Sequence, residues 1–322
     1  MEPAQFLTTS GVIIVAGKGG VGKTTVTAAL AVAASSVGLR VLIVEVEGKD
    51  SMASAFETGR LSYDEQVLVE AARDHAGVHA RTVTPDDALL DYLNERGLQR
   101  LSKRLVSSGL LDMISTAIPG IRDILVLGKV KQLERSGTFD LVLVDAPAAG
   151  HAITFLQSAS GLLDAVAVGP INAQARDVQD LLGDPDRCRI LLVTAPEETP
   201  VNELVETAYS LEDRVGVALG PVVVNGVHPP LAGLAVDPEV AAAAAGVALV
   251  EGEAEALRGA ARFRTARSDL QQEQLTRLAE ELPLPQLLLP DLFTSDLGRA
   301  GLDTLAAALI EQLGSLESEP RA

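Results

Sequence analysis

A glycine-rich loop near the start of the chain constrains the fold more than any other feature of the sequence. It follows a short apolar run, 12–16, that is rich in β-branched residues, and it precedes a helical stretch, 24–36. The loop reads Gly17-Lys18-Gly19-Gly20-Val21-Gly22-Lys23-Thr24-Thr25, which fits the pattern G-x-x-x-x-G-K-[ST]. In such a unit, the glycines let several backbone N–H groups converge, and the helix adds its positive N-terminus. The sequence therefore predicts a loop that binds phosphate.

The side chains around this loop predict a nucleotide site with a metal ion. Lys23 is placed to reach the β- and γ-phosphates as a point charge, and the Thr24 hydroxyl can complete the shell of a Mg²⁺ ion. Asp145 comes directly after the apolar run 141–144, and a carboxylate in that position can hold Mg²⁺ through water. The backbone of the loop is expected to bind the phosphates. The residues predicted to bind the nucleotide there are Gly17, Gly19, Gly20, Val21, Gly22, Lys23, Thr24 and Thr25.

The rest of the chain alternates short apolar runs with helical stretches. This alternation predicts an α/β fold with a doubly wound, mostly parallel sheet that is flanked by helices. After the first strand, the predicted strands are 41–46, 141–144, 165–168, 190–193, 222–224 and 287–289.

One region of the chain carries a helical pattern without any strand signal. Residues 86–136 contain leucines at roughly helical spacing, and we expect them to form an inserted helical subdomain. Two further helices are predicted over 240–250 and 251–282. Neither an internal repeat nor a clear linker is evident, so the prediction is a single domain over 1–322 with a frayed tail at 315–322.

Composition narrows the class of protein. The net charge of −18 argues against nucleic-acid binding, because no basic surface is available to neutralise phosphates. Cys188 is the single cysteine, so neither an internal disulfide nor a CxxC pair can form within the chain. The longest uncharged window, 215–236, contains three prolines, and it predicts strand, turn and loop rather than a membrane span. The start of the chain lacks the layout of a signal peptide. We therefore expect a cytoplasmic protein without stable membrane insertion.

Several segments together resemble the ArsA-type ATPases, which include arsenical-pump ATPases and tail-anchored-protein targeting factors. The second lysine of the loop, Lys18, is similar to the signature lysine of P-loop ATPases that act as face-to-face dimers. In those ATPases this lysine reaches the nucleotide of the other subunit. The other matching segments are PGIRDILVLGKVKQL (119–133), DAPAAGHAITFL (145–156), VVVNG (222–226) and ARSDLQQEQLTRL (266–278). The resemblance implies ATP and Mg²⁺ as cofactors, and it implies that Asn225 reads the adenine.

The departures from the family pattern matter as much as the matches. In register with the family's first switch, Glu47 stands where the catalytic Asp usually stands, and a Glu can still accept a hydrogen bond from the attacking water. In the second switch, Ala148 and Ala149 replace the usual Pro and Thr, which favours slow hydrolysis. The zinc-bridging CxxC of the targeting factors and the arsenite-binding cysteines of the pumps are absent, so no zinc is expected. The chain looks most like the short actinobacterial-type members.

These observations predict a Mg²⁺-dependent ATPase with Lys18, Glu47 and Asp145 as its catalytic residues. It would act as a nucleotide-switched dimer, either with itself or with a paralogous ATPase, and handle an unknown client protein.

One alternative is a nucleotide-gated binding or scaffold protein that hydrolyses ATP poorly, and Ala148, Ala149 and Glu47 support it. Another is a positioning ATPase similar to MinD or ParA. However, the acidic helical tail after residue 301 lacks the basic face of a membrane anchor. An iron–sulfur reductase would need two ligand cysteines per subunit.

Overall fold

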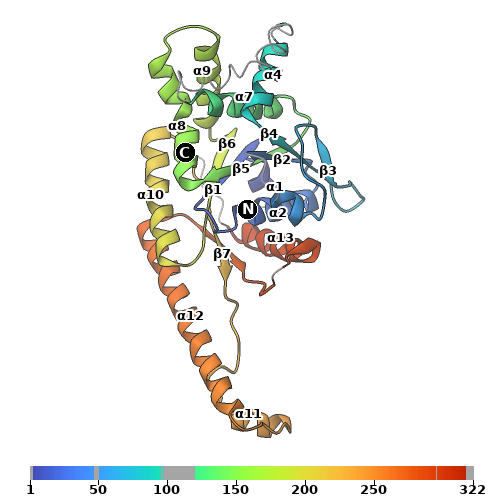
Figure 1. Cartoon of the computed structure of the whole chain (residues 1–322), viewed down its shortest axis with the longest axis vertical. Helices are drawn as coiled ribbons and strands as arrows, with labels where there is room; N and C mark the ends of the chain where they lie inside the picture. Colours follow the sequence, from blue (N-terminus) through green and yellow to red (C-terminus); the bar gives the residue numbers. More distant parts are fainter. Residues whose placement is uncertain (1–2, 47–50, 96, 98–119, 295, 317–322) are drawn as a thin grey trace.

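A large, mostly parallel sheet forms the centre of the computed structural model (Figure 1), which describes residues 3–46, 51–95, 97, 120–294 and 296–316. Across these residues, eight strands form one sheet in the order β3-β4-β2-β5-β1-β6-β7-β8. All neighbouring strands pair in parallel except β3 and β4, which are antiparallel. The strands are β1 (Val12–Gly17), β2 (Val41–Val46), β3 (Gln66–Val69), β4 (Val78–Val83), β5 (Leu141–Ala148), β6 (Cys188–Thr194), β7 (Val222–Val227) and β8 (Gln286–Pro290). The predicted doubly wound α/β class is confirmed.

Helices cover both faces of the sheet, because each central strand is apolar on both sides. In β1, Val12 and Ile14 pack into one core, whereas Ile13 and Val15 pack into the other. The first core is covered by α4 (Pro85–Glu95), α7 (Ile121–Arg135), α8 (Ala149–Ala165), α9 (Pro170–Leu182), α10 (Glu198–Val215) and the end of α12 (Glu253–Glu281). The second core is covered by α1 (Pro3–Thr8), α2 (Lys23–Ser36), α3 (Ser51–Ala55) and α13 (Gly298–Ser315). A fully buried central strand needs this two-sided cover.

The helix α12 extends away from the sheet, and α11 (Pro238–Ala245) lies at its far end (Figure 1). The buried residues of α12 are Gln271, Leu275 and Leu278, all near its C-terminal end. The predicted helix over 240–250 is therefore only partly right, since α11 begins earlier and ends at Ala245. Gly246 adopts a left-handed conformation with φ of 67°, and this ends the helix.

Two other predictions about strands need correction. The run 165–168 is not a strand: Ala165 is the last residue of α8, and Val168 is 82% exposed before Pro170 opens α9. A four-residue apolar run fits the end of a helix as well as it fits a strand. Strands β3 and β4 are missing from the sequence prediction. In β4, His79 and Arg81 alternate with buried residues, so this strand lacks a continuous apolar run.

The predicted helical insert, 86–136, is described only in part. Helices α4 and α7 form its two ends, and both are helical as expected. Residues 96 and 98–119 lie outside the described part of the chain, as do the tail residues 317–322. In the residues that the structure does describe, no helix is both long and apolar enough to cross a bilayer.

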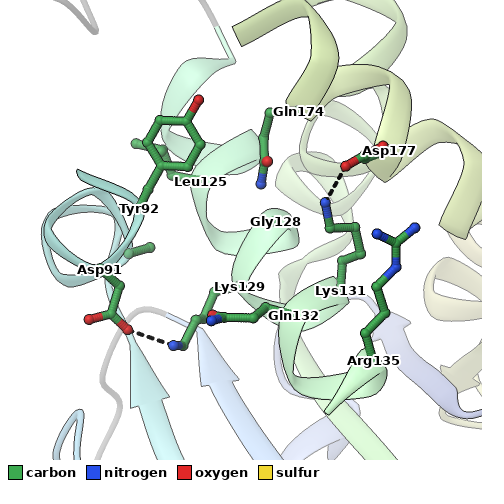
Figure 2. Close-up of a pocket in the computed structure, with 11 residues that line it drawn as sticks. Asp91, Tyr92, Leu125, Gly128, Lys129, Lys131, Gln132, Arg135, Gln174 and Asp177 are labelled. Carbon is green, nitrogen blue, oxygen red and sulfur yellow. Dashed lines mark hydrogen bonds and ion pairs between the residues drawn. The ribbon is translucent and has the colours of Figure 1, made fainter. Parts of the chain in front are cut away.

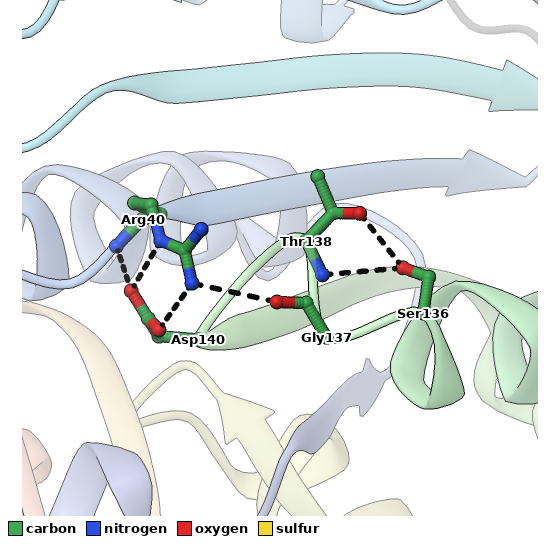
Figure 3. Close-up of polar contacts among 5 residues, drawn as sticks. All are labelled: Arg40, Ser136, Gly137, Thr138 and Asp140. Atoms are coloured by element: carbon green, nitrogen blue, oxygen red, sulfur yellow. Dashed lines mark hydrogen bonds and ion pairs between the residues drawn. The ribbon is translucent and has the colours of Figure 1, made fainter.

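An ion pair joins the amino ends of two central strands, β2 and β5. It lies at the end of the strands opposite the glycine-rich loop. Arg40, just before β2, donates from Nε and its backbone N to Oδ2 of Asp140, at 3.0 and 2.8 Å, and from Nη2 to Oδ1 at 2.8 Å. Asp140 precedes β5, and its backbone N–H donates to the Arg40 carbonyl at 2.9 Å. The loop Ser136–Thr138 packs beside this pair (Figure 3), where Gly137 accepts a further bond from Arg40. The guanidinium of Arg40 holds the pKa of Asp140 below its ordinary value.

Replacing this carboxylate should therefore change how stability depends on pH. Because the pKa of Asp140 is lowered in the folded chain, its contribution is present above the ordinary value of about 3.9 and disappears as the pH falls below it. We expect Asp140→Asn to lower the free energy of unfolding at pH 7, with a difference from wild type that persists down to about pH 4 and shrinks as the pH falls further. Urea unfolding at a series of pH values measures this. The exposed Asp213→Asn is the control, and an equal response of both variants would contradict the assignment.

Candidate functional site

The glycine-rich loop lies at the carboxyl end of β1, in the middle of the sheet. Strand β1 is buried along its whole length between β5 and β6, and α2 begins at Lys23 immediately after the loop. Gly20 and Gly22 adopt left-handed conformations with φ of 87° and 89°, which L side chains rarely tolerate. The predicted strand–loop–helix unit is therefore present, and the glycines of the motif are needed for its shape.

Two glycines of the loop pack closely against residues of the strands β6 and β7. A Cβ added to Gly17 would lie 2.2 Å from the backbone carbonyl oxygen of Val193, in β6. A Cβ added to Gly22 would lie 2.2 Å from Nδ2 of Asn225, in β7. In the rest of the loop, Gly19 and Gly20 are exposed, whereas Val21 is buried and Thr25 half-buried. The loop therefore combines an exposed turn with a tightly packed base.

Lys23 lies across the loop rather than pointing into solvent. Its Nζ donates to the backbone carbonyl of Lys18 at 3.0 Å, and only 9% of the residue is exposed. A lysine held in this way places one positive charge inside the loop with most of its hydration removed. Such a charge interacts strongly with phosphate oxygens, because the local dielectric is low.

Thr24 and Asp145 form a pair of oxygen ligands beside the loop. Thr24 Oγ1 donates to Asp145 Oδ2 at 2.7 Å, and Asp145 is 5% exposed. Asp145 lies in β5, in register with Val15 of β1, so the strand pairing fixes its position. Hydroxyl and carboxylate oxygens are the hard ligands that Mg²⁺ prefers, and Mg²⁺ usually takes only one or two of them from a protein. These two residues fit a Mg²⁺ ion that is shared with phosphates and water.

A second buried carboxylate lies next to this pair, and it was not predicted from the sequence. Glu45 of β2 is in register with Asp145, so both side chains point to the same face of the sheet. Glu45 is 1% exposed, and its Oε2 accepts a bond from Thr82 Oγ1 at 2.9 Å. The signal was an acid within the otherwise apolar strand 41–46. The predicted base, Glu47, lies outside the described residues.

The predicted adenine reader is close to the loop. Asn225, near the end of β7, donates from Nδ2 to the carbonyl of Val21 at 3.0 Å, so its amide is oriented by the loop itself. Gln271 of α12 holds the end of the same strand. Its Nε2 donates to the carbonyl of Gly226 at 3.1 Å, and its Oε1 accepts from the backbone N–H of His228 at 2.8 Å. Gln271 is 5% exposed and was not identified from the sequence, where it is one polar residue within a long charged helix.

An exposed aromatic ring is found just beyond the neighbouring strand β8. Phe293 is 63% exposed and has a φ of 51°, an uncommon conformation for a bulky residue. The Arg264 guanidinium lies 4.8 Å from its ring centroid, and the His228 ring lies 5.3 Å away. Burial and the charge of Arg264 lower the pKa of His228, which favours the neutral form of its ring. No sequence pattern indicates this ring cluster, because its members are far apart in the chain.

Lys18 is paired within its own chain. Its Nζ lies 2.5 Å from Oε1 of Glu203 in α10, and both side chains are partly exposed, at 34% and 41%. The predicted role of Lys18 at the nucleotide of another subunit stays a prediction. Cys188, in contrast, is an ordinary core residue, and burial raises the pKa of its thiol to about 12.

A separate cavity of about 310 Å³ lies between α4, α7 and α9 (Figure 2), at the base of the predicted insert. Two ion pairs cross it: Lys129 with Asp91 and Lys131 with Asp177, both at 2.5 Å. The ammonium of Lys131 lowers the pKa of Asp177. These pairs fasten α7 to α4 on one side and to α9 on the other. In the described part of the chain, no group of three or more His, Cys, Asp or Glu side chains could hold a metal ion.

Comparison with known proteins agrees with this geometry. Residues 10–168, which include the loop and Asp145, match the family model described as anion-transporting ATPase. A putative ATPase, Mb3704, of Mycobacterium bovis is 34% identical over 221 residues, and ATPase BagA of Mycobacterium tuberculosis is equally similar. A putative arsenical pump-driving ATPase of Halobacterium salinarum is 26% identical over 226 residues, which cover 66% of this chain and 35% of that protein.

The match to the mycobacterial relatives covers 66% of this chain and 64% of their length. ATPase get3 of Schizosaccharomyces japonicus is 29% identical over 155 residues, 48% of this chain and 46% of its own. The family model covers the loop, the Thr24–Asp145 pair and the strands that carry them. On these residues and this fold, residues 10–168 form an ArsA-type ATPase domain.

Proposed function

We propose that this chain is a Mg²⁺-dependent ATPase that acts as a dimer whose shape changes with the bound nucleotide. The observation that carries the proposal is the 2.7 Å contact between Thr24 and Asp145 beside a loop whose lysine is already buried. A phosphate-binding loop alone would bind many anions, whereas a hydroxyl–carboxylate pair at its helical end is specific for a nucleotide with its metal.

Each residue of the site has a distinct part in this proposal. The loop backbone and Lys23 bind the β- and γ-phosphates and neutralise their charge. Thr24 and Asp145 would hold Mg²⁺, which supplies further neutralisation of the phosphate oxygens. Glu47 orients the attacking water as a general base. Hydrolysis then changes the charge at the loop, which is the kind of event that switches neighbouring segments between two arrangements.

The partner in this proposal is a second ATPase subunit, either another copy of this chain or a paralogue. The relative named as a putative arsenical pump-driving ATPase supports a chain that couples ATP to work on another protein, and the relative named ATPase get3 supports ATPase activity. The helical insert 86–136, whose two ends are α4 and α7, is the element that we expect to contact a client protein. A scaffold that binds ATP but hardly hydrolyses it remains the second candidate, since alanines occupy positions 148 and 149.

Phosphate release and light scattering test the proposal together. The chain is measured with Mg-ATP, with Mg-ADP and without nucleotide, alone and with proteins that co-purify from its native source. We expect Mg²⁺-dependent turnover and a dimer that forms most strongly with ATP. Binding of ATP without measurable turnover in every condition would instead favour the scaffold. A chain that binds no nucleotide would overturn both.

The base preference tests the role of Asn225. A side-chain amide can donate to a ring nitrogen of adenine and accept from its exocyclic amine. Asn225→Ala should narrow the preference for ATP over GTP by about tenfold, as expected for the loss of one or two hydrogen bonds. Competition binding of the two nucleotides measures it. If the preference is unaltered, the base is read by another group.

A further inference from the structure

The ion pair between Lys18 and Glu203 joins the phosphate loop to α10. Lys18 is the first residue after β1, and Glu203 lies in the second turn of α10, 185 residues later in the chain. The contact places a strong acceptor on the ammonium that, if the proposed dimer forms, is expected to reach the other subunit's nucleotide. Both partners are more than a third exposed, at 34% and 41%, so solvent screens the pair and it contributes little to folding stability.

The helix that carries Glu203 is tied to α12 by two contacts. Arg277 of α12 donates to Asn202 Oδ1 at 2.6 Å, and Arg267 pairs with Glu197 at 2.9 Å. The backbone carbonyl of Glu203 also accepts from Thr207 Oγ1 at 2.6 Å within the helix. Lys18, in contrast, extends a flexible four-carbon side chain from an exposed loop. When the pair opens, we expect the lysine to move and the helix to stay in place.

The cation in this contact is a lysine, although most cations of the chain are arginines. The chain has 20 arginines but only 6 lysines, so lysine is the less common cation in this chain. Arginine would bind a carboxylate with two parallel hydrogen bonds, whereas a lysine ammonium exchanges more readily between a carboxylate and a phosphate. A weak, exchangeable pair suits a residue with two alternative partners.

We propose that Glu203 is a positioning residue that holds Lys18 within its own subunit until a nucleotide phosphate competes for the ammonium. The inference rests on the proposed function, because it deepens the role of Lys18 in the dimer. Glu203 then sets the ATP concentration at which Lys18 becomes available to the facing subunit. Its carboxylate carries one negative charge, whereas the triphosphate of Mg-ATP carries more, and this difference drives the exchange.

Removing the charge of Glu203 is the central test. In Glu203→Gln the competitor is lost and the shape is kept, so the ATP concentration at half-maximal dimerisation should fall about two- to fivefold, the range for one exposed ion pair. Light scattering with Mg-ATP measures it. Glu206→Gln is the matched control, since Glu206 is exposed on the same helix and should give the wild-type value. In a Lys18→Ala background, Glu203→Gln should change nothing.

Two outcomes would overturn the inference. If Glu203→Gln and Glu206→Gln behave alike, the pair does not restrain Lys18. If Glu203→Gln has the same effect with and without Lys18, the carboxylate acts through the general charge of the protein. Thermal unfolding of each variant confirms that the fold is kept.

The failure of the dimer can be told apart from the failure of this inference. If the wild type stays monomeric with ATP, the proposed dimer is wrong, and calorimetry of Mg-ATP binding to the monomer becomes the readout. Releasing Lys18 beside its own loop should then tighten binding two- to fivefold in Glu203→Gln, and only where Lys18 is present. An unchanged affinity in that measurement would overturn the role of Glu203 as well.

Discussion

Replacing Lys23 with alanine should abolish useful binding of Mg-ATP. Only 9% of Lys23 is exposed, and its ammonium donates to the carbonyl of Lys18 within the loop. A charge-assisted contact to phosphate contributes about 1.5–3 kcal/mol, so its loss weakens binding by about ten- to 150-fold. If the loop also rearranges without its lysine, the loss of affinity for Mg-ATP would be larger. Isothermal calorimetry with Mg-ATP measures the change.

The matched control for this prediction is Lys18→Ala. It removes a lysine from the same loop, but one that is bound to Glu203 and exposed, so binding to a single subunit should change by only a few fold. Similar losses in both variants would mean that loop charge in general, and not the buried lysine, holds the phosphates. An unchanged affinity in Lys23→Ala would remove the phosphate-loop assignment itself.

The second large effect is expected at Gly17, where a single methyl group meets a backbone. In Gly17→Ala the new Cβ would lie 2.2 Å from the carbonyl oxygen of Val193, which is in register with Gly17 on the adjacent strand. Neither atom can move without separating β1 from β6 in the centre of the sheet. Overpacking of this kind costs about 1–3 kcal/mol or more, and it displaces the loop that follows. We expect lower stability in urea together with loss of ATP binding.

A glycine with open space around it provides the comparison. A Cβ added to Gly161, in α8, would meet no atom of the surrounding structure within 4 Å, and alanine is the better helix former by about 1 kcal/mol. Gly161→Ala should therefore be neutral or stabilising and should keep nucleotide binding. If Gly17→Ala were equally harmless, β1 and β6 would have to separate at a lower free-energy cost than their complete burial implies.

Some residues of this site could be predicted from the sequence, and others could not. Gly17 to Thr25 and Asp145 could be placed, because each follows a continuous apolar strand and the chemistry sits where parallel strands end. Glu203 and Gln271 could not, because their partners lie far along the chain and no local pattern marks a polar residue that reaches a distant loop. The strand β4 was missed for a different reason, since its side chains alternate in polarity.

The long helix α12 has a mechanical consequence for a protein of this kind. Gln271 binds the end of the strand that carries Asn225, and Arg264 contacts the Pro229 carbonyl and the Phe293 ring. Residues 253–263 extend about 16 Å beyond Arg264 at 1.5 Å per residue. A rotation of about 10° near Arg264 would therefore displace the far end by about 3 Å. A small rotation of α12 close to the strand that carries Asn225 would therefore be enlarged at α11, because α11 lies at the far end of the helix.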